Sequence, residues 1–392
     1  MREESVGVYL HVPFCERVCP YCDFAVVAAR RLEPEREDAY VAALLRELDL
    51  RKGDFAGLAL ASIYLGGGTP ALLRPESLAR LVAAVRAAFQ AAGEPEVTLE
   101  ANPSTLERAR LPGFREAGVN RLSLGIQSFD DGVLKRLGRA HRAPEGRAAV
   151  RAARAAGFAN LSLDLIFAVP GQGLAILEAD LDEVAAIGPE HLSAYTLTVE
   201  AGTPYARAVG RGQLRLPPEE EVLAMLEAIP ARLAPAGLEP YEISSLARPG
   251  AESVHNRRYW ERLPVLGLGV GAWSSEPRSP AAPHGARRAN PRDLAAYLDG
   301  LAASVDGRTP AAEEILAPRV ARGEAVFLAL RTRRGLDAAR FAAEFGGPPR
   351  VFFDEPIARL AAAGLLDEEP GGDLRLTPRG RLVADSVGAE FV

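Results

Sequence analysis

The chain has 392 residues, 48% of them hydrophobic and 25% charged, which is enough to bury a large core and to form one large domain beside a smaller one. The formal net charge of −6 argues against a broad basic face, so nucleic acid is not the expected partner. No apolar run reaches the roughly 20 residues that span a bilayer, and the first residues carry no signal-peptide core. We therefore expect a cytoplasmic protein without stable membrane insertion.

Six short β-type runs recur through the first half of the chain, and helical patterns separate most of them. The expected strands are residues 6–12, 62–65, 96–101, 121–126, 161–167 and 191–197. The expected helices include residues 38–51, 76–92, 105–117 and 143–156. Alternation of strand and helix predicts a parallel sheet, so the fold class is α/β, an open or closed barrel of βα units.

Chemistry in such barrels gathers where strands end, and this sequence places unusual stretches at those points. The stretches that directly follow an expected strand are Gly66-Gly-Gly-Thr-Pro70, Glu100-Ala-Asn-Pro103, Gln127-Ser-Phe129 and Val169-Pro-Gly-Gln172. We therefore expect the functional residues of the barrel among them.

The second half of the chain has a mixed pattern. A helix is expected near residues 219–233, an irregular Gly- and Trp-rich section over 241–275, and a loop over 275–290. From about residue 306 the chain is mainly helical, with a hairpin over 371–380 before a last helix. This combination suggests a small winged-helix-like module, and in an acidic chain its role is packing or partner contact rather than DNA binding.

All three cysteines of the chain, Cys15, Cys19 and Cys22, follow the first expected strand. An odd number without partners elsewhere argues against disulfides, so the thiols are expected to stay reduced and to bind something. Structural zinc is one alternative, although it usually takes four protein ligands in two separated pairs. A cluster of four irons and four sulfides held by three cysteines leaves one iron open to a small molecule.

The spacing Cys-x3-Cys-x2-Cys after a first strand resembles the radical S-adenosylmethionine superfamily. In that superfamily the open iron of a [4Fe–4S] cluster binds S-adenosylmethionine, and an electron from the cluster cleaves it to an adenosyl radical. The resemblance implies a partial (β/α)6 TIM-like barrel, followed here by a smaller, mainly helical C-terminal domain.

The other strand ends carry groups that suit a sulfonium nucleoside. The glycines at 66–68 permit close backbone approach, although they also fit a tight strand-to-helix turn. Glu100 and Asp164 stand late in expected strands, where an unpaired buried charge is costly, and Gln127 and Arg139 suit a ligand carboxylate. Each of these four taken alone also fits a structural polar role.

A narrower resemblance covers nearly the whole chain. The motifs similar to the oxygen-independent coproporphyrinogen III oxidase group are Tyr9-Leu-His-Val-Pro-Phe-Cys15, Tyr21-Cys-Asp-Phe24, Gly66-Gly-Gly-Thr-Pro70, Glu100-Ala-Asn-Pro103, Gly125-Ile-Gln-Ser-Phe129, Asp164-Leu-Ile166 and Pro170-Gly-Gln172. Carried over by position, the resemblance assigns Cys15, Cys19 and Cys22 to the cluster. It assigns to S-adenosylmethionine the residues Tyr9, Gly67, Gly68, Glu100, Gln127, Arg139 and Asp164. Tyr9 also fits an ordinary strand aromatic.

Two features favour the heme chaperone branch of that group, whose members bind heme and deliver it to respiratory heme proteins. The oxidases carry a further cysteine two residues after the third, where this chain has Phe24. The stretch His255-Asn-Arg-Arg-Tyr-Trp260 resembles the heme-binding motif of the chaperones, with His255 as the iron ligand. Tyr259 and Trp260 could then pack on a porphyrin face. The alternative is that His255 and Trp260 cap and fill the open side of the barrel. Many members of the family have a histidine where this chain has Trp273, so the role of that histidine is not carried over to this chain.

The first hypothesis is therefore a heme chaperone that holds a [4Fe–4S] cluster, S-adenosylmethionine and heme, with a homodimer as a possible assembly. The second is an enzyme, oxygen-independent coproporphyrinogen III oxidase or another radical decarboxylase. A transcription factor built on the C-terminal module is a third, with little beyond the hairpin to favour it. The expected domains are residues 1–235 for the barrel with the cluster, 236–305 for an irregular extension with the heme motif, and 306–392 for the C-terminal domain.

Overall fold

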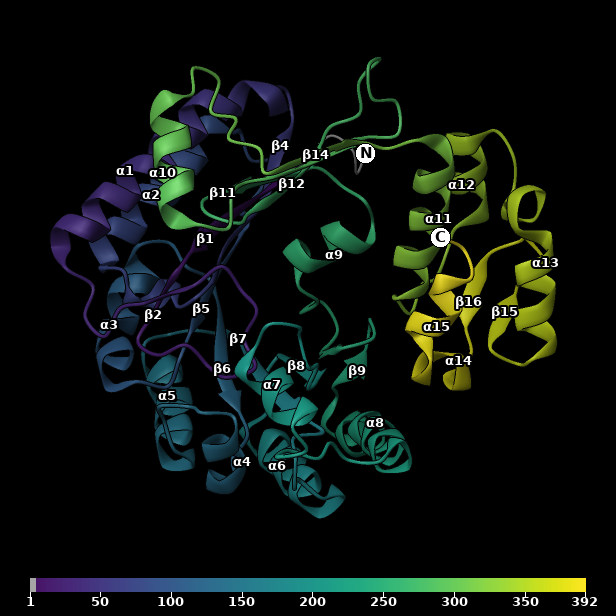
Figure 1. Cartoon of the computed structure of the whole chain (residues 1–392), viewed down its shortest axis with the longest axis horizontal. Coiled ribbons are helices and arrows are strands. Elements are labelled where there is room, and N and C mark those ends of the chain that lie inside the picture. The colour runs from purple at the N-terminus through teal and green to yellow at the C-terminus, as the bar shows by residue number, and fades with distance from the viewer. Residues whose placement is uncertain (1–4) are drawn as a thin grey trace.

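A computed structural model describes residues 5–392, and a twelve-stranded sheet forms its centre (Figure 1). Six parallel strands lie side by side in chain order. They are β1 (Ser5–Val12), β4 (Ala59–Gly67), β5 (Glu96–Ala101), β6 (Arg121–Gln127), β7 (Asn160–Phe167) and β8 (His191–Thr196). These are the six strands expected from the sequence, so the partial barrel is confirmed.

Helices pack on the outer face of these strands (Figure 1). They are α1 (Pro34–Arg51), α2 (Pro75–Ala88), α3 (Thr105–Glu116), α4 (Asp131–Arg136), α5 (Ala143–Ala155), α6 (Leu174–Ile187) and α8 (Glu219–Leu233). On β1 the alternate residues Val6, Val8, Leu10 and Val12 are fully buried against this layer. The side chain of Tyr9, with the opposite parity, faces the interior of the barrel, as the period of a strand requires.

The section expected to be irregular extends the sheet past β1. β11 (Val265–Leu268) pairs parallel with β1, and β12 (Trp273–Glu276), β13 (Ala286–Ala289) and β14 (Ala312–Ile315) follow it antiparallel. The loop expected over 275–290 is therefore wrong at both ends. Charge pairs hold β13 and β14 together, because Arg287 and Arg288 of β13 stand in register with Glu314 and Glu313 of β14 and form ion pairs with them.

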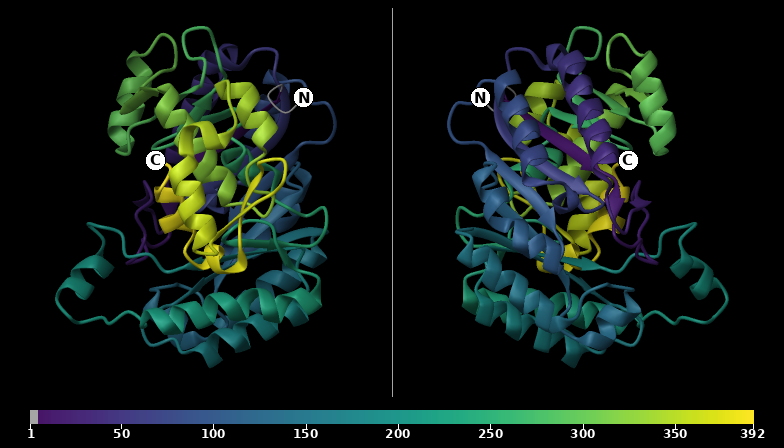
Figure 2. Two further views of the ribbon diagram at one scale, coloured as in Figure 1. Left: turned by 90° about the vertical axis from the view of Figure 1, so that its right-hand side faces the viewer. Right: turned by 90° about the vertical axis from the view of Figure 1, so that its left-hand side faces the viewer.

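At the other edge, β10 (Ser245–Ala247) and β9 (Glu239–Pro240) follow β8 antiparallel. The short helix α9 (Val254–Trp260) connects the two arms of the sheet and lies in the gap between them (Figure 1). Two small elements, β2 (Phe14–Cys15) and β3 (Val27–Ala28), frame the cysteine loop, and α7 (Pro204–Gly210) projects from the barrel (Figure 2). α10 (Leu294–Ala303) packs beside α1.

The C-terminal region stands opposite the open side of the barrel (Figure 2). It contains α11 (Pro318–Leu330), α12 (Ala338–Phe345), α13 (Pro349–Ala362), α14 (Pro378–Leu382) and α15 (Ala384–Ala389). Its hairpin pairs β15 (Leu366–Glu368) with β16 (Leu374–Leu376), so it begins before the stretch expected at 371–380. These elements enclose a hydrophobic core separate from that of the barrel.

No helix among residues 5–392 is long and apolar enough to cross a membrane.

Candidate functional site

Cys15 ends β2, and Cys19 and Cys22 lie on the segment between β2 and β3, at the end of the barrel where the parallel strands finish. All three thiols are free and half-buried. The Thr69 hydroxyl donates to the Cys15 Sγ at 3.7 Å, and the Arg139 Nη1 donates to the Cys19 Sγ at 3.7 Å. The turn after β4 and the loop after α4 therefore supply polar neighbours to the cysteine loop.

The thiol chemistry of this loop fits a cationic group. Burial raises the pKa of the Cys15 thiol to about 11 and also raises that of Cys22. Thiolates at these positions need a positive partner, which iron would supply. In the described part of the chain, no three His, Cys, Asp or Glu side chains converge on one point that would hold a single ion. A four-iron cluster takes each thiolate on a different iron, so it does not require such convergence.

Backbone crowding explains the glycines after β4. Gly67 has φ of 107°, and a Cβ there would lie 2.5 Å from the imidazole of His11. A Cβ on Gly68 would lie 2.8 Å from the carbonyl oxygen of Phe14, next to Cys15. Side chains at these positions would displace the cysteine loop, so both glycines keep the strand end close to it.

Glu100 of β5 and Asp164 of β7 are half-buried carboxylates of the barrel interior, on the two strands that flank β6. Glu100 accepts hydrogen bonds from the Tyr64 hydroxyl at 2.8 Å and from the Gly67 N–H at 3.1 Å. Asp164 accepts from the Ser123 hydroxyl at 3.1 Å. Burial raises the pKa of Glu100 to about 7 and that of Asp164 to about 6. A cationic or hydroxyl-bearing ligand would stabilise their charged forms.

Gln127 and Arg139 form a second group beside the cysteine loop. A Cβ on Gly125 would lie 3.0 Å from the Gln127 Nε2 and 3.3 Å from the Arg139 Nη2, so the two side chains meet over that residue. Gln127 has φ of 65°, a strained value for a residue with a side chain. The Gln127 Oε1 and the Arg139 Nε are buried without a partner among the described residues. Orphaned polar atoms next to free thiols fit a polar ligand at this end of the barrel.

Tyr9 lies between His11 and Tyr64 in the barrel interior. Its hydroxyl contacts the Nδ1 of His11 at 3.1 Å, and its ring stacks on that of Tyr64 at 6.1 Å between centroids. A Cβ on Gly66 would lie 3.1 Å from the Tyr9 ring and 3.2 Å from the Glu100 carboxyl carbon. The structure thus brings Tyr9, Gly67 and Glu100 together at the same strand ends.

His255 lies deeper in the barrel interior and is buried. Its Nδ1 contacts the Ser62 hydroxyl at 2.9 Å, and its Nε2 contacts the Tyr259 hydroxyl at 3.2 Å. Burial, with Arg258 and Arg121 nearby, lowers the pKa of His255 to about 3. The imidazole is therefore neutral at any physiological pH.

The neighbours of His255 in the motif have partners of their own. Arg257 forms ion pairs with Glu252 and Glu261, and Arg258 donates to the backbone oxygens of Ser5 and Pro264. The Trp260 ring lies under the guanidinium of Arg331 at 5.2 Å. Both arginines are therefore engaged by groups of the protein itself.

Sequence reasoning missed two residues that hold this site together. Asn102 donates to the Thr69 hydroxyl at 2.9 Å and accepts from Arg139, so it joins the neighbours of Cys15 and Cys19. Its place in the stretch Glu100–Pro103 was the available signal. Tyr64, the partner of Glu100, looks like any strand aromatic, so the sequence offered no signal for it.

Two known protein families match parts of this chain. The Radical SAM superfamily model matches residues 9–184, and the HemN C-terminal domain model matches residues 316–383. A heme chaperone HemW of Bacillus subtilis is 33% identical over 98% of this chain and 99% of its own length. The chain belongs to the HemW heme chaperone family.

Other relatives agree with this assignment. HemW of Mycobacterium tuberculosis is 38% identical over 99% of this chain and 95% of its own length. The solved structure of coproporphyrinogen III oxidase (HemN) from Escherichia coli, described as a radical SAM enzyme, superimposes with a TM-score of 0.83 at 26% identity. The match covers 100% of this chain and 91% of that one. Membership of the radical SAM superfamily implies a [4Fe–4S] cluster and S-adenosylmethionine.

Proposed function

We propose that this chain is a heme chaperone that binds heme through His255 and delivers it to heme proteins of the respiratory chain. The observation that carries the proposal is the neutral imidazole of His255, held in the barrel between Ser62 and Tyr259. Iron coordination needs an unprotonated ring nitrogen, and burial keeps this one unprotonated. The names of the full-length relatives support the same activity.

Ligation through Nε2 requires one rearrangement. The Tyr259 hydroxyl occupies that nitrogen, so it has to move before iron can bind. The Ser62 contact at Nδ1 would remain and would keep the ring oriented, as partners of the second nitrogen do at metal sites.

Cys15, Cys19 and Cys22 would hold a [4Fe–4S] cluster, and the residues from Tyr9 to Asp164 described above would hold S-adenosylmethionine. When bound, these groups supply one-electron chemistry and a source of adenosyl radical. Glu100 and Asp164 would take the hydroxyl and cationic parts of the ligand, and Gln127 with Arg139 its carboxylate. A role in heme binding or release, rather than porphyrin decarboxylation, agrees with Phe24, which is 66% exposed beside the cluster loop.

A heme titration of anaerobically reconstituted protein, followed at the Soret band, tests the iron ligand. His255→Ala is expected to weaken binding at least about tenfold or to change the spectrum, because it removes the axial nitrogen. His191→Ala is the matched control. His191 is also buried, with its Nδ1 on a serine hydroxyl at 2.8 Å and its Nε2 on a tyrosine hydroxyl at 2.9 Å. Equal effects of the two variants would contradict ligation by His255, and Tyr259→Phe should leave the ligand intact.

Delivery is tested separately, with heme-loaded protein mixed with an apo heme protein of the respiratory chain. Transfer is expected as a change from the spectrum of the donor to that of the acceptor. The structural likeness to HemN keeps coproporphyrinogen III oxidase as a second candidate. Decarboxylation of coproporphyrinogen III by the reconstituted, reduced protein with S-adenosylmethionine would favour that enzyme over the chaperone.

A further inference from the structure

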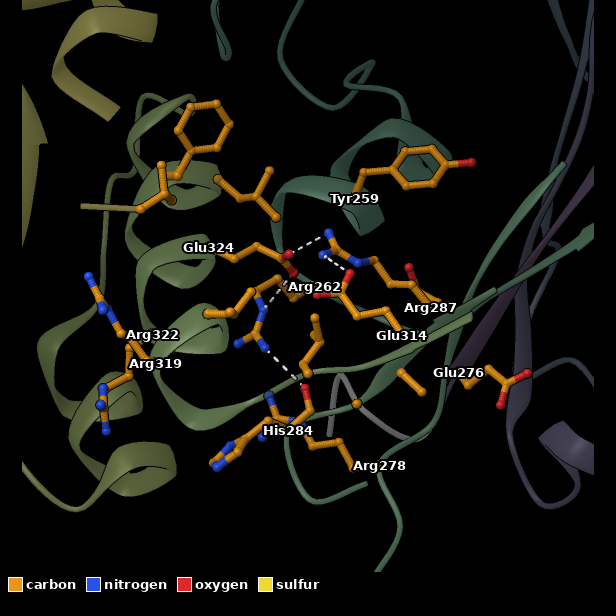
Figure 3. Close-up of a pocket in the computed structure, with 18 of the residues that line it drawn as sticks. Tyr259, Arg262, Glu276, Arg278, His284, Arg287, Glu314, Arg319, Arg322 and Glu324 are labelled. Carbon is orange, nitrogen blue, oxygen red and sulfur yellow. Dashed lines mark hydrogen bonds and ion pairs between the residues drawn. The ribbon is translucent and has the colours of Figure 1, made fainter. Parts of the chain in front are cut away.

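Several ion pairs fasten the C-terminal domain to the sheet extension. Arg262, in the loop after α9, forms ion pairs with Glu324 and Glu344 at 3.4 and 2.9 Å. Arg287 of β13 forms another with Glu324 at 2.6 Å. Figure 3 shows the two arginines around Glu324. Because these pairs act together, the loss of one leaves the domain attached.

The stretch of residues 197–218 between β8 and α8, which we call the α7 segment, is attached in a different way. It projects from the barrel (Figure 2), and its helix α7 has seven residues, too few to be stable alone. Within that helix only Tyr205 is buried, with 4% of its surface exposed. The attachment of α7 therefore depends on one side chain.

Tyr205 contacts two other segments of the chain at once. Its backbone N–H donates to the carbonyl oxygen of Pro20 at 3.0 Å, and its hydroxyl donates to the carbonyl oxygen of Arg136 at 2.7 Å. Its ring meets the ring of Tyr21 edge-on, with 6.3 Å between the centroids. Both rings pack in an apolar cluster with Val133 of α4, separate from the main core. Tyr205 thus joins the cysteine loop to the end of α4.

The cysteine loop has little else to hold its second half. Among residues 5–392, the backbone of residues 16–22 makes one hydrogen bond to the backbone of another segment, the bond between Tyr205 and Pro20. Cys15 differs, because its carbonyl oxygen accepts from the Ala29 N–H at 2.7 Å as β2 pairs with β3. Cys19 and Cys22 therefore lie on a stretch with a single backbone tether.

The same tether presses this stretch against the loop after α4. Gly138 has φ of 68°, and a Cβ there would lie 2.6 Å from the Cδ of Pro20. The next residue, Arg139, donates to the Cys19 Sγ, and the Tyr21 side chain is hydrogen-bonded to both Cys19 and Arg139. Pro20 is thus enclosed between Gly138 on one side and Tyr205 on the other.

We infer that Tyr205 is a positioning residue of the cysteine loop, which holds Cys19 and Cys22 in place beside Arg139 before any cluster binds. A loop that is already ordered loses less conformational entropy when it takes up its ligand. The inference rests on the proposed cluster and extends it, because it gives the α7 segment a part in cluster binding.

Alkylation of the cofactor-free, full-length protein by iodoacetamide tests the order of the loop without any metal. Tryptic cleavage after Arg17 separates Cys15 from Cys19 and Cys22, so mass spectrometry follows the two groups of thiols independently. Tyr205→Ala is expected to speed the alkylation of Cys19 and Cys22 about tenfold, since one hydrogen bond and one aromatic pair together account for about that factor. Cys15 should react at the wild-type rate, because β3 still holds it.

Three further variants make this result specific. Tyr205→Phe keeps the ring and loses only the hydrogen bond to Arg136, so it should speed the reaction about threefold, and it serves alone if Tyr205→Ala does not fold. Arg207→Ala is the matched control on α7, where the exposed guanidinium donates to the Gly202 carbonyl oxygen at 2.7 Å. Arg262→Gln loosens the C-terminal domain instead. Both controls should leave all three thiols at their wild-type rates.

Three results would overturn the inference. They are unchanged rates of Cys19 and Cys22 in both Tyr205 variants, an equal acceleration of Cys15, and the same acceleration in Arg207→Ala.

Iron release gives a second measurement, in anaerobically reconstituted protein exposed to the ferrous chelator bathophenanthroline. Tyr205→Ala is expected to lose iron about tenfold faster than the wild type, and equal rates would also overturn the inference. If the wild type assembles no [4Fe–4S] cluster while the alkylation rates change as expected, the proposed cofactor fails and the ordering of the loop by Tyr205 stands.

Discussion

Glu100 shows the cost of a buried carboxyl group in the barrel interior. Its carboxyl is surrounded by the Tyr64 hydroxyl, the Gly67 N–H and the carboxylate of Asp164, and burial raises its pKa to about 7. In the cofactor-free protein, both acids thus face the interior, and the nearby guanidinium of Arg121 does not offset the cost of burying them. A cationic ligand relieves that cost.

A prediction follows for the pH dependence of stability in the cofactor-free protein. Since the pKa of Glu100 is higher in the folded state, its contribution to stability is fully present below pH 4.5 and is lost as the pH rises to about 7. Because of Glu100, the unfolding free energy is expected to be up to about 3 kcal/mol lower at pH 8 than at pH 5. Glu100→Gln should remove this part of the difference. Urea titrations of the wild type and the variant at pH 5 and at pH 8 measure the unfolding free energies. Exposed Glu116→Gln is the control, and an identical pH difference in both variants would contradict the prediction.

For individual residues, most side chains of the site could be predicted from the sequence, but their hydrogen-bond partners could not. Cys15, Glu100 and Gln127 stand at or just after the ends of expected strands, so their placement at one end of the barrel was predictable, whereas Arg139 reaches it from the loop after α4. The unusual φ of Gln127 and the link from Asn102 to Thr69 depend on contacts between distant segments. The roles of His255 and of the S-adenosylmethionine residues stay predictions.

Among the elements, α9 depends most on contacts from elsewhere. It has only seven residues, too few for a helix to be stable alone. The hydroxyl of buried Ser253 accepts from the Asn256 N–H at 3.2 Å, and Glu96 of β5 accepts from the N–H groups of Val254 and His255. The barrel thus fixes the start of the helix that carries His255.

Removal of the Ser253 hydroxyl tests how much this N-cap stabilises α9. Ser253→Ala should reduce the unfolding free energy by about 0.5–2 kcal/mol, the usual cost of removing a helix N-cap. Urea unfolding measures the change. Thr198→Ala is the control, because the exposed Thr198 hydroxyl makes only one contact, at 3.5 Å. A loss no larger than that of the control would show that Glu96 alone holds the helix.

The elements that sequence reasoning missed lie in the extended arm of the sheet. β11 contains Gly267, which interrupts the apolar pattern of a strand, yet a Cβ there would lie 2.1 Å from the carbonyl oxygen of Trp273. β13 is the polar run Ala286–Ala289, a strand only because its arginines pair with glutamates of β14. Both depend on partners that local patterns do not reveal. The expected barrel helices, by contrast, match α1, α2, α3, α5 and α8 to within a few residues, whereas α4 and α6 were not among them.

At the scale of the molecule, the barrel and the C-terminal domain each have a hydrophobic core of their own, and charged side chains form part of the contact between them. Leu181 is fully buried in the barrel core and Leu330 in the C-terminal core. Between them, ion pairs from Arg262 and Arg278 to Glu344 connect the sheet extension to α12. Polar interfaces of this kind favour separate unfolding of the parts they join.

Matched truncations test that independence. Leu330→Ala and Leu181→Ala each create a cavity that should cost about 2–5 kcal/mol. In a calorimetric scan, Leu330→Ala is expected to lower the transition of the C-terminal domain alone, and Leu181→Ala that of the barrel alone. A single transition shifted equally by both variants would contradict the prediction and show one cooperative unit.

The placement of β11 beside β1 has a consequence for synthesis of the chain. One edge of β1 pairs with β4 early, but its other edge waits for Val265–Leu268, roughly 200 residues later. At about 5–20 residues per second, the ribosome needs about 10–40 s to supply that strand. During this interval the nascent chain has an open, apolar strand edge next to its cysteine loop, the kind of surface that holdase chaperones cover. Assembly of the proposed iron–sulfur cluster on Cys15, Cys19 and Cys22 would then best follow the pairing of Val265–Leu268 with β1, once that edge is closed.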